Sequence, residues 1–174
     1  MKSCLTILLL VCPLFLGLLY GQDAPKRPSN IDVSDFDSFK NNSFDILDQS
    51  TKANSDIKTL DKEIKNYAGV ISTLKVDKLK KDFSAVMELN KFRKTLVAKI
   101  GQLDNQGKEV LNSAKSFTPK MKSMSAVSNT NKSIKGLDHS KNNLSSVASL
   151  LKEDADLLGK ELKSRGETVE EFVE

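Results

Sequence analysis

Apolar side chains recur at every seventh position over most of the chain after residue 34, and polar residues fill most of the positions between them. Positions on one side of an α-helix recur at this spacing, whereas a half-buried strand alternates apolar and polar residues. Three such tracts follow one another, and each predicts a long amphipathic helix, continuous or broken. The seven-residue lines are Phe39, Ile46, Ala53, Leu60, Tyr67 and Leu74, then Leu89, Leu96, Leu103, Val110, Phe117 and Met124, then Leu137, Leu144, Leu151 and Leu158.

The signals that end these tracts are uneven. Residues 74–81 contain no glycine or proline, although Asp77 is a candidate N-cap for a following helix. Residues 123–132 are rich in serine, asparagine and threonine, which predicts a polar linker. Gly166 is suited to the end of the third tract, because glycine readily adopts the left-handed conformation found there. We therefore expect an all-α protein, an antiparallel bundle of three to five amphipathic helices over residues 32–165.

The beginning of the chain has the three parts of a secretory signal peptide. Lys2 precedes an apolar run over residues 4–20, and the small Gly21 follows as a suitable cleavage point. The run approaches the roughly 20 residues that span a bilayer, so an uncleaved membrane anchor is the alternative. Pro13 interrupts the run and no cluster of basic residues follows at once, which favours cleavage. We therefore expect residues 1–21 to be a signal peptide and the protein to be secreted.

Two short segments flank the expected bundle. Residues 22–31 contain two prolines and little that is apolar, which predicts a flexible leader. The dibasic pair Lys26-Arg27 within it is a candidate processing site, although chance pairs are common in a chain rich in lysine. Residues 166–174 predict an acidic C-terminal tail.

Charge is distributed unevenly along the chain. Residues 75–141 carry 15 basic and 6 acidic side chains, whereas residues 22–74 carry 7 and 9, and residues 142–174 carry 4 and 8. One interpretation is a basic face for an anionic surface, such as lipid head groups or acidic polysaccharide. The other, which we favour, is that the basic middle packs beside acidic helices of the same chain. The absence of tryptophan and of aromatic residues interleaved with the basic run argues against a nucleic-acid partner. The basic residues that would meet an anionic surface are Lys78, Lys81, Arg93 and Lys94.

Few residues beyond the signal peptide are suited to catalysis. Both cysteines lie inside it, so the remaining chain forms no disulfide and offers no thiol nucleophile. The single histidine, His139, has Asp138 and Ser140 as neighbours, but adjacent residues on a helix point in different directions and do not form a triad. The acidic residues within 153–156 lack the glycine turn and alternate spacing of a calcium loop, which indicates a solvated helix face. We therefore expect a protein that is not an enzyme and that holds no cofactor and no metal ion.

Three Asn-X-Ser sequons make Asn41, Asn131 and Asn143 candidate glycosylation sites in a secreted protein. Asn131 is the strongest of the three because it lies in the expected polar linker. Asn41 and Asn143 lie within helical tracts, where they must face water if they are to carry a glycan.

Aromatic residues and methionine gather at apolar positions in the middle of the chain. Flexible methionines and flat aromatic rings repack around ligands of variable shape, so this composition suits a pocket for a fatty acyl chain or another lipid. Such residues are also ordinary constituents of a helical core. The residues expected to line the pocket are Tyr67, Phe83, Met87, Phe92, Phe117, Met121 and Met124.

Three apolar segments of the chain resemble the pattern of a known family. They are Ile57–Gly69 (IKTLDKEIKNYAG), Val110–Phe117 (VLNSAKSF) and Ile134–Leu151 (IKGLDHSKNNLSSVASLL). Together they resemble the fungal hydrophobic surface-binding proteins, which are related to the cell-wall galactomannoproteins. The resemblance covers roughly residues 55–165 and rests on spaced Leu, Ile and Phe, with no catalytic motif. It implies a small secreted helical bundle that adsorbs to hydrophobic surfaces or encloses a lipid. The Lys- and Asn-rich surface, the acidic C-terminus and the lack of a Ser/Thr-rich stalk depart from the family pattern, and they argue against a wall-anchored form.

Two functions stay open on the sequence alone. The first, which we favour, is a secreted non-enzymatic helical protein that binds an apolar ligand, such as a fatty acid or lipid, or a hydrophobic surface. The alternative is an extracellular structural or interaction protein that self-associates through coiled-coil helices, because the seven-residue spacing is sustained. The apolar lines are wider than a coiled-coil seam, since Val147, Leu150 and Leu157 add a second stripe, which favours the bundle.

Overall fold

The structure, a computed structural model, describes residues 24–173, and every regular element in that range is helical. The signal peptide expected at residues 1–21 lies outside the described residues. Among the described residues, no helix is both long and apolar enough to cross a membrane. The prediction of an all-α fold is confirmed. The elements in chain order are the helix α1 (Ser34–Tyr67), the 3-10 helix η1 (Ala68–Thr73), and the helices α2 (Val76–Ser116), α3 (Lys120–Ser145) and α4 (Ala148–Ser164).

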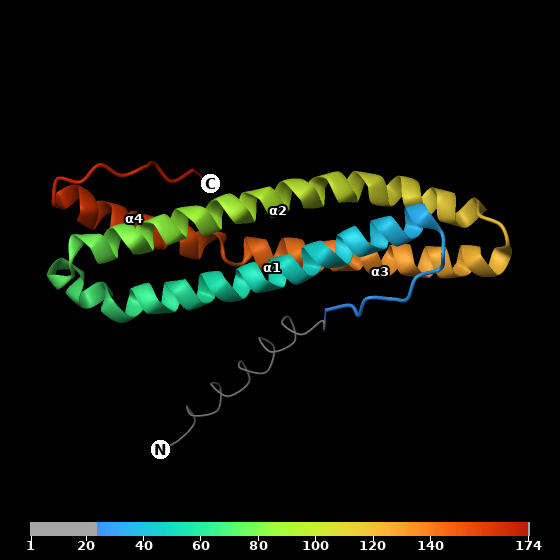
Figure 1. The fold of residues 1–174 in the computed structure, drawn as a ribbon, viewed down its shortest axis with the longest axis horizontal. Coiled ribbons are helices and arrows are strands. Elements are labelled where there is room, and N and C mark those ends of the chain that lie inside the picture. The colour runs from blue at the N-terminus through green and yellow to red at the C-terminus, as the bar shows by residue number, and fades with distance from the viewer. Residues whose placement is uncertain (1–23, 174) are drawn as a thin grey trace, which may run out of the picture.

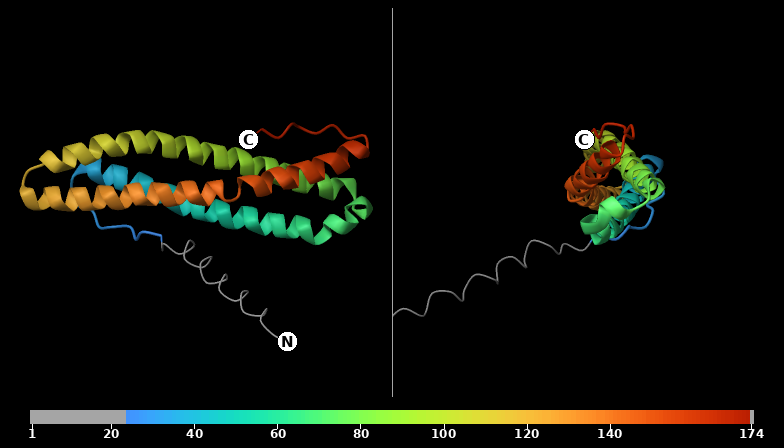
Figure 2. Two further views of the ribbon diagram at one scale, coloured as in Figure 1. Left: turned by 180° about the vertical axis from the view of Figure 1, so that it is seen from behind. Right: turned by 90° about the vertical axis from the view of Figure 1, so that its left-hand side faces the viewer.

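Three long arms pack side by side in an antiparallel bundle (Figure 1). Helix α1 forms the first arm, α2 returns beside it as the second, and α3 and α4 follow each other along the third. Both α3 and α4 contact α1 and α2, each over its own half of the bundle. The end-on view in Figure 2 shows the arms grouped around a common axis. The expected bundle is thus a three-armed one whose third arm is broken.

The seven-residue apolar lines face one another inside the bundle and form two hydrophobic clusters. One lies beside α3 and includes Phe39, Leu96 and Leu137, each 0% exposed. The other lies beside α4 and includes Ile57 and Leu151, also 0% exposed. Burying a leucine or phenylalanine side chain contributes about 1.5–3 kcal/mol to a fold. The two clusters are therefore the main source of stability in residues 24–173, which contain no cysteine.

Hydrogen bonds from α1 mark the break in the third arm, which the apolar pattern did not predict. The Asn54 amide donates to the Asn143 carbonyl at 2.7 Å and to the Ser146 hydroxyl at 3.0 Å. The Ser146 hydroxyl donates to the same carbonyl at 2.9 Å. In an uninterrupted helix the backbone amide of Val147 would donate to this carbonyl. Two side chains donate to it instead, at the point where α3 ends and α4 begins.

Residues 123–132 belong to α3, and the prediction of a polar linker there is wrong. Several of the small polar side chains in this stretch are buried in the bundle. The Ser123 hydroxyl donates to the Ala114 carbonyl at 2.7 Å, and the Asn129 amide donates to the Ser29 carbonyl at 2.9 Å. Composition indicates a loop because serine and asparagine compete with the helix backbone for hydrogen bonds. Here those groups find partners on other segments, which only the packed structure supplies.

Residues 24–33, which include most of the expected flexible leader, lie along the bundle. The Ile31 amide donates to the Asp37 carboxylate at 3.0 Å. Pro25 lies over α3, where a Cβ added to Gly136 would come within 3.9 Å of the proline ring. These contacts place the leader against α1 and α3, as Figure 1 also shows.

The turn expected within residues 74–81 is short and comes at the start of that range. Helix η1 ends at Thr73, and α2 begins at Val76 with Lys75 as its N-cap. Asp77 lies in the first turn of α2, where a negative charge is favourable, and not at the N-cap. The change of direction begins before this range, in η1, which contains Gly69 and a non-helical backbone at Val70.

The predicted end of the third tract at Gly166 is confirmed. Gly166 has a φ of +81°, and its amide donates to the Lys163 carbonyl. The amide of Glu167 donates to the Leu162 carbonyl, which completes the hydrogen bonding of the helix end. Glycine suits this position because other residues are strained at positive φ.

Leu96→Ala and Leu151→Ala should each lower the free energy of unfolding by about 2–5 kcal/mol, because each leaves a cavity in a filled core. The two residues belong to different clusters, so the variants test the clusters separately. Urea denaturation followed by circular dichroism measures the change. The control is Val97→Ala, at a position that is 47% exposed, and it should change the free energy by less than about 1 kcal/mol. A leucine variant as stable as this control would contradict the described core.

Candidate functional site

The seven residues expected to line one apolar pocket lie in separate parts of the structure. Tyr67, Phe83 and Met87 pack on the cluster beside α4. Phe117 packs on the other cluster, edge-on to Phe36 with ring centroids 5.5 Å apart. The uninterrupted helix α2 carries Phe83 and leads to Phe117, which separates them by about 50 Å. Seven-residue spacing puts side chains on one face of a helix, but it does not bring them to the same position along the axis of the bundle. The remaining three residues are exposed: Phe92, Met121 and Met124.

Two of the most exposed large apolar side chains among the described residues lie at the turn between α2 and α3. Met121 is 82% exposed and Met124 is 69% exposed. Their spacing of three residues puts them on the same side of α3. In Figures 1 and 2 this turn extends beyond the start of α1, so two arms reach it and the third does not. We call residues 115–124 the methionine tip. Its exposed basic residues are Lys115, Lys120 and Lys122.

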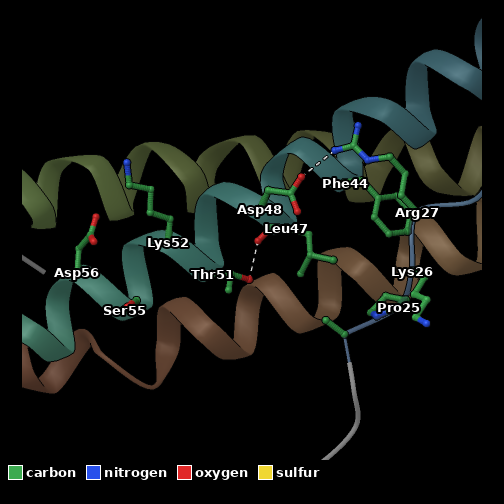
Figure 3. A pocket seen from close by; sticks show the side chains of 11 residues that line it. Pro25, Lys26, Arg27, Phe44, Leu47, Asp48, Thr51, Lys52, Ser55 and Asp56 are labelled. Atoms are coloured by element: carbon green, nitrogen blue, oxygen red, sulfur yellow. Dashed lines mark hydrogen bonds and ion pairs between the residues drawn. The ribbon is translucent and has the colours of Figure 1, made fainter.

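A groove of about 660 Å³ lies between the leader and α1 (Figure 3). Phe44 and Leu47, both largely buried, form its apolar wall together with Pro25. Lys52 and Asp56 stand at its rim, so charges of both signs meet any occupant. A small apolar wall with a balanced rim gives the groove no preference for one class of ligand.

Arg27 stands at one end of this groove and ties the leader to α1 (Figure 3). Its guanidinium donates to Asp45 at 2.6 Å and to Asp48 at 2.9 Å. It also lies over the Phe44 ring, 5.7 Å from the centroid. Arg27 belongs to the dibasic pair considered as a processing site. A protease that recognises this arginine in the folded protein would first have to displace both carboxylates.

A buried carboxylate lies where α4 packs on α1. Asp154 is 2% exposed, and its Oδ2 has no hydrogen-bond partner. Burial and the nearby Asp61 carboxylate raise the pKa of Asp154 to about 6, and Lys65, which pairs with Asp61 at 2.6 Å, opposes the shift. The prediction of a solvated face over residues 153–156 is therefore wrong at this position. The sequence carried a signal for it, because Asp154 follows the buried Leu151 by three residues on a helix.

A second buried carboxylate, Asp82, is fully engaged by its neighbours. The Tyr67 hydroxyl donates to it at 2.5 Å, and the Lys78 ammonium donates to it at 2.6 Å. Burial and this hydrogen bond raise the pKa of Tyr67 above its usual value. Tyr67 and Lys78, expected respectively in the apolar pocket and on the anion-binding face, thus bind a carboxylate of their own chain.

The chain itself covers part of the basic face expected on α2. Lys80 pairs with Glu167 at 2.7 Å, and Lys94 donates to the Val173 carbonyl at 3.4 Å. The first contact joins the basic middle of the chain to its acidic end, which agrees with the intramolecular interpretation of the charge pattern. Two further expected residues lie on the same helix, one exposed and one half-buried: Lys81 and Arg93.

The stretch Asp138-His139-Ser140 lies inside α3. The buried Ser140 hydroxyl donates to the Gly136 carbonyl at 2.9 Å, and Asp138 pairs with Lys141 at 3.5 Å. These contacts engage groups that a catalytic triad would need. In the part of the chain that the structure describes, no three His, Cys, Asp or Glu side chains are placed to hold a metal ion.

All three sequons lie in helices. Asn131 is exposed on α3, whereas Asn41 is half-buried on α1. The Asn143 amide donates to the Thr51 hydroxyl at 3.3 Å, across the contact between α3 and α1. Exposure therefore favours Asn131, although for a different reason from the linker expected there.

Comparison with known proteins adds no relative. No protein family, no curated protein and no solved structure matches the chain. The resemblance to hydrophobic surface-binding proteins stays a prediction, and a function has to be argued from the geometry described above.

Asp154→Asn should raise the free energy of unfolding at pH 7 by about 1–3 kcal/mol, because it removes a charge buried beside Asp61. The folded protein holds a proton on Asp154 up to a pH of about 6, whereas the unfolded chain loses it near a pH of about 4. The contribution of Asp154 to stability is therefore fully present below a pH of about 4, and it is lost as the pH rises from about 4 to about 6. Urea denaturation across the window measures the effect, and the variant should show a shallower fall in stability.

Asp156→Asn, the same substitution at an exposed position on α4, is the matched control and should retain the wild-type pH dependence. An Asp154→Asn variant that is less stable than wild type at pH 7, or that keeps the full pH dependence, would contradict the described burial of this carboxylate.

Proposed function

We propose that this protein is a secreted, non-enzymatic binding protein that attaches to a lipid or other hydrophobic surface through the methionine tip. The observation that carries the proposal is the exposure of Met121 and Met124, at 82% and 69%. Clustered apolar side chains that water reaches on a folded protein often mark a binding surface. Methionine suits such a surface because its flexible thioether chain adapts to an irregular apolar partner.

The charges around the tip favour a surface with negative head groups. Lys115, Lys120 and Lys122 are exposed within a few residues of the two methionines. A lysine near an anionic bilayer contributes about 1 kcal/mol of attraction, and its long aliphatic stem packs on apolar surroundings. The methionines would enter the apolar layer while the lysines stay at the level of the head groups.

The filled interior favours surface attachment over an enclosed ligand. The apolar lines of the three arms meet in two clusters of buried side chains, and the residues expected to form a pocket are distributed between these clusters and the surface. Adsorption to a hydrophobic surface is also one of the two activities that the family resemblance implies. Binding at the tip needs no opening of the core.

Met121→Ser/Met124→Ser should weaken binding to vesicles of phosphatidylserine and phosphatidylcholine by at least about tenfold, because two apolar side chains no longer leave water on binding. Co-sedimentation with the vesicles measures the bound fraction. Lys120→Gln/Lys122→Gln should reduce binding to these vesicles and leave the weaker binding to pure phosphatidylcholine unchanged.

Val70→Ser is the matched control, since Val70 is 53% exposed and lies in η1 at the other end of the bundle. It should bind vesicles like wild type. Equal binding by the methionine variant, the control and the wild type would exclude the tip as the attachment site, and no binding by the wild type would exclude the proposed function.

Self-association through coiled-coil helices is the second candidate function. The sustained seven-residue spacing favours it, but most of those positions are used inside one chain, where residues such as Leu96 and Leu151 are 0% exposed. We expect the purified protein to be a compact monomer in light scattering across a range of concentrations. An elongated dimer would instead favour the coiled-coil function.

A further inference from the structure

The C-terminal segment lies back along the bundle instead of leaving it. After Gly166 the chain turns and runs beside α4 and α2 (Figures 1 and 2). The Asn90 amide donates to the Val173 carbonyl at 2.8 Å, and Lys94 donates to the same carbonyl at 3.4 Å. With the pair between Lys80 and Glu167, these contacts hold both ends of the segment. We call residues 167–173 the tail.

Two apolar side chains of the tail, three residues apart, face the helices. Val169 and Phe172 are half-buried and pack on the cluster beside α4. A Cβ added to Gly159 would lie 3.4 Å from Phe83 and 3.9 Å from Val169. Glycine in the middle of a helix is destabilising relative to alanine, so its presence in α4 fits a site where another segment approaches the backbone closely.

The tail fills this site only in part. A hollow of about 460 Å³ remains between the tail and α4, and its floor includes Phe83, Ala155 and Gly159. Lys160 and Lys163 line it from α4, together with one acidic residue of that helix. Lys80 and Lys94 on α2 contact the tail itself, so four lysines stand near its glutamates.

We propose that the groove between α2 and α4 is a docking site for an acidic peptide segment of a partner protein, and that the tail is its displaceable resident ligand. The segment it fits carries two apolar side chains three residues apart with carboxylates between and beside them. Val169 and Phe172 supply the first feature, and Glu167, Glu170 and Glu171 supply the second.

The contacts of the tail allow it to be displaced without unfolding the helices. The tail has no regular structure of its own, and it joins α4 through a glycine at positive φ. The pair between Lys80 and Glu167 is partly exposed, with 49% and 31% of the side chains accessible, so salt weakens it. A partner segment that fills more of the hollow would therefore bind the groove more tightly than the tail does and displace it.

The experiment uses the full chain with Val169→Ser/Phe172→Ser, which should release the tail and open the groove. A fluorescent peptide with the sequence of residues 167–174 should bind this variant with a dissociation constant in the micromolar range, measured by anisotropy. It should bind the wild type at least about tenfold more weakly, because the wild-type tail occupies the site. Val173→Ser, in the same tail but at a side chain that is 60% exposed, is the control and should behave like wild type.

Two further arms test where and how the peptide binds. Lys80→Gln/Lys94→Gln in the released background should weaken binding, and both positions are exposed, so folding is not at risk. A peptide that keeps its glutamates but has serine in place of the valine and phenylalanine corresponding to Val169 and Phe172 should bind at least about tenfold more weakly.

Three outcomes would overturn the proposal. The first is a folded Val169→Ser/Phe172→Ser variant that does not bind the peptide. The second is equal binding by the wild type, which would place the peptide elsewhere. The third is equal binding by the peptide that lacks both apolar side chains, which would show a surface that responds to charge alone, such as one for anionic lipid or polysaccharide.

Discussion

The whole structure depends on the burial of one apolar line from each of three helical arms. No disulfide constrains residues 24–173, and the contacts between helices are the interactions that connect the two ends of this long molecule. Small side chains make the close approach possible. Ser43, Ser50 and Ser133 are fully buried next to these lines, and each donates its hydroxyl hydrogen bond to a carbonyl of its own helix. A serine whose hydroxyl is hydrogen-bonded in this way occupies little volume and leaves no unpaired polar group. Burying it in the core therefore costs little free energy.

The two proposed binding surfaces lie where the three-armed packing is incomplete. At the turn between α2 and α3 two arms extend beyond the third, and methionines are left in water. At the other end the third arm is the separate helix α4, and the tail lies beside it over a groove that it does not fill. At the break between α3 and α4, Asn54 of α1 and Ser146 both donate to the Asn143 carbonyl.

Several charges of the chain are paired between its own segments. Arg27 attaches the leader to two carboxylates of α1, and Lys80 attaches the tail to α2. Asp154 is the exception, because it is buried beside Asp61 and no donor reaches its Oδ2. Such a group makes the contact between α4 and α1 weaker when it is ionised than when it is protonated. The helix that carries Asp154, α4, also forms one wall of the tail groove.

The sequence by itself determined the helical class, the three tracts, many of the core positions and the helix end at Gly166, because seven-residue spacing and a glycine after the last apolar position are local properties of the chain. It did not determine which residues of the three arms lie at the same position along the axis of the bundle. Leu89 and Phe117 share an apolar line but pack on different clusters, and Met124 continues that line yet faces solvent. The hydrogen-bond partners of Asn54, Asn129 and Arg27 could not be predicted either, since each partner lies in a different segment of the chain from the residue that it binds. Tertiary structure decided these points because burial and hydrogen bonding depend on what the other arms place opposite each residue, and periodicity along one helix carries no information about that.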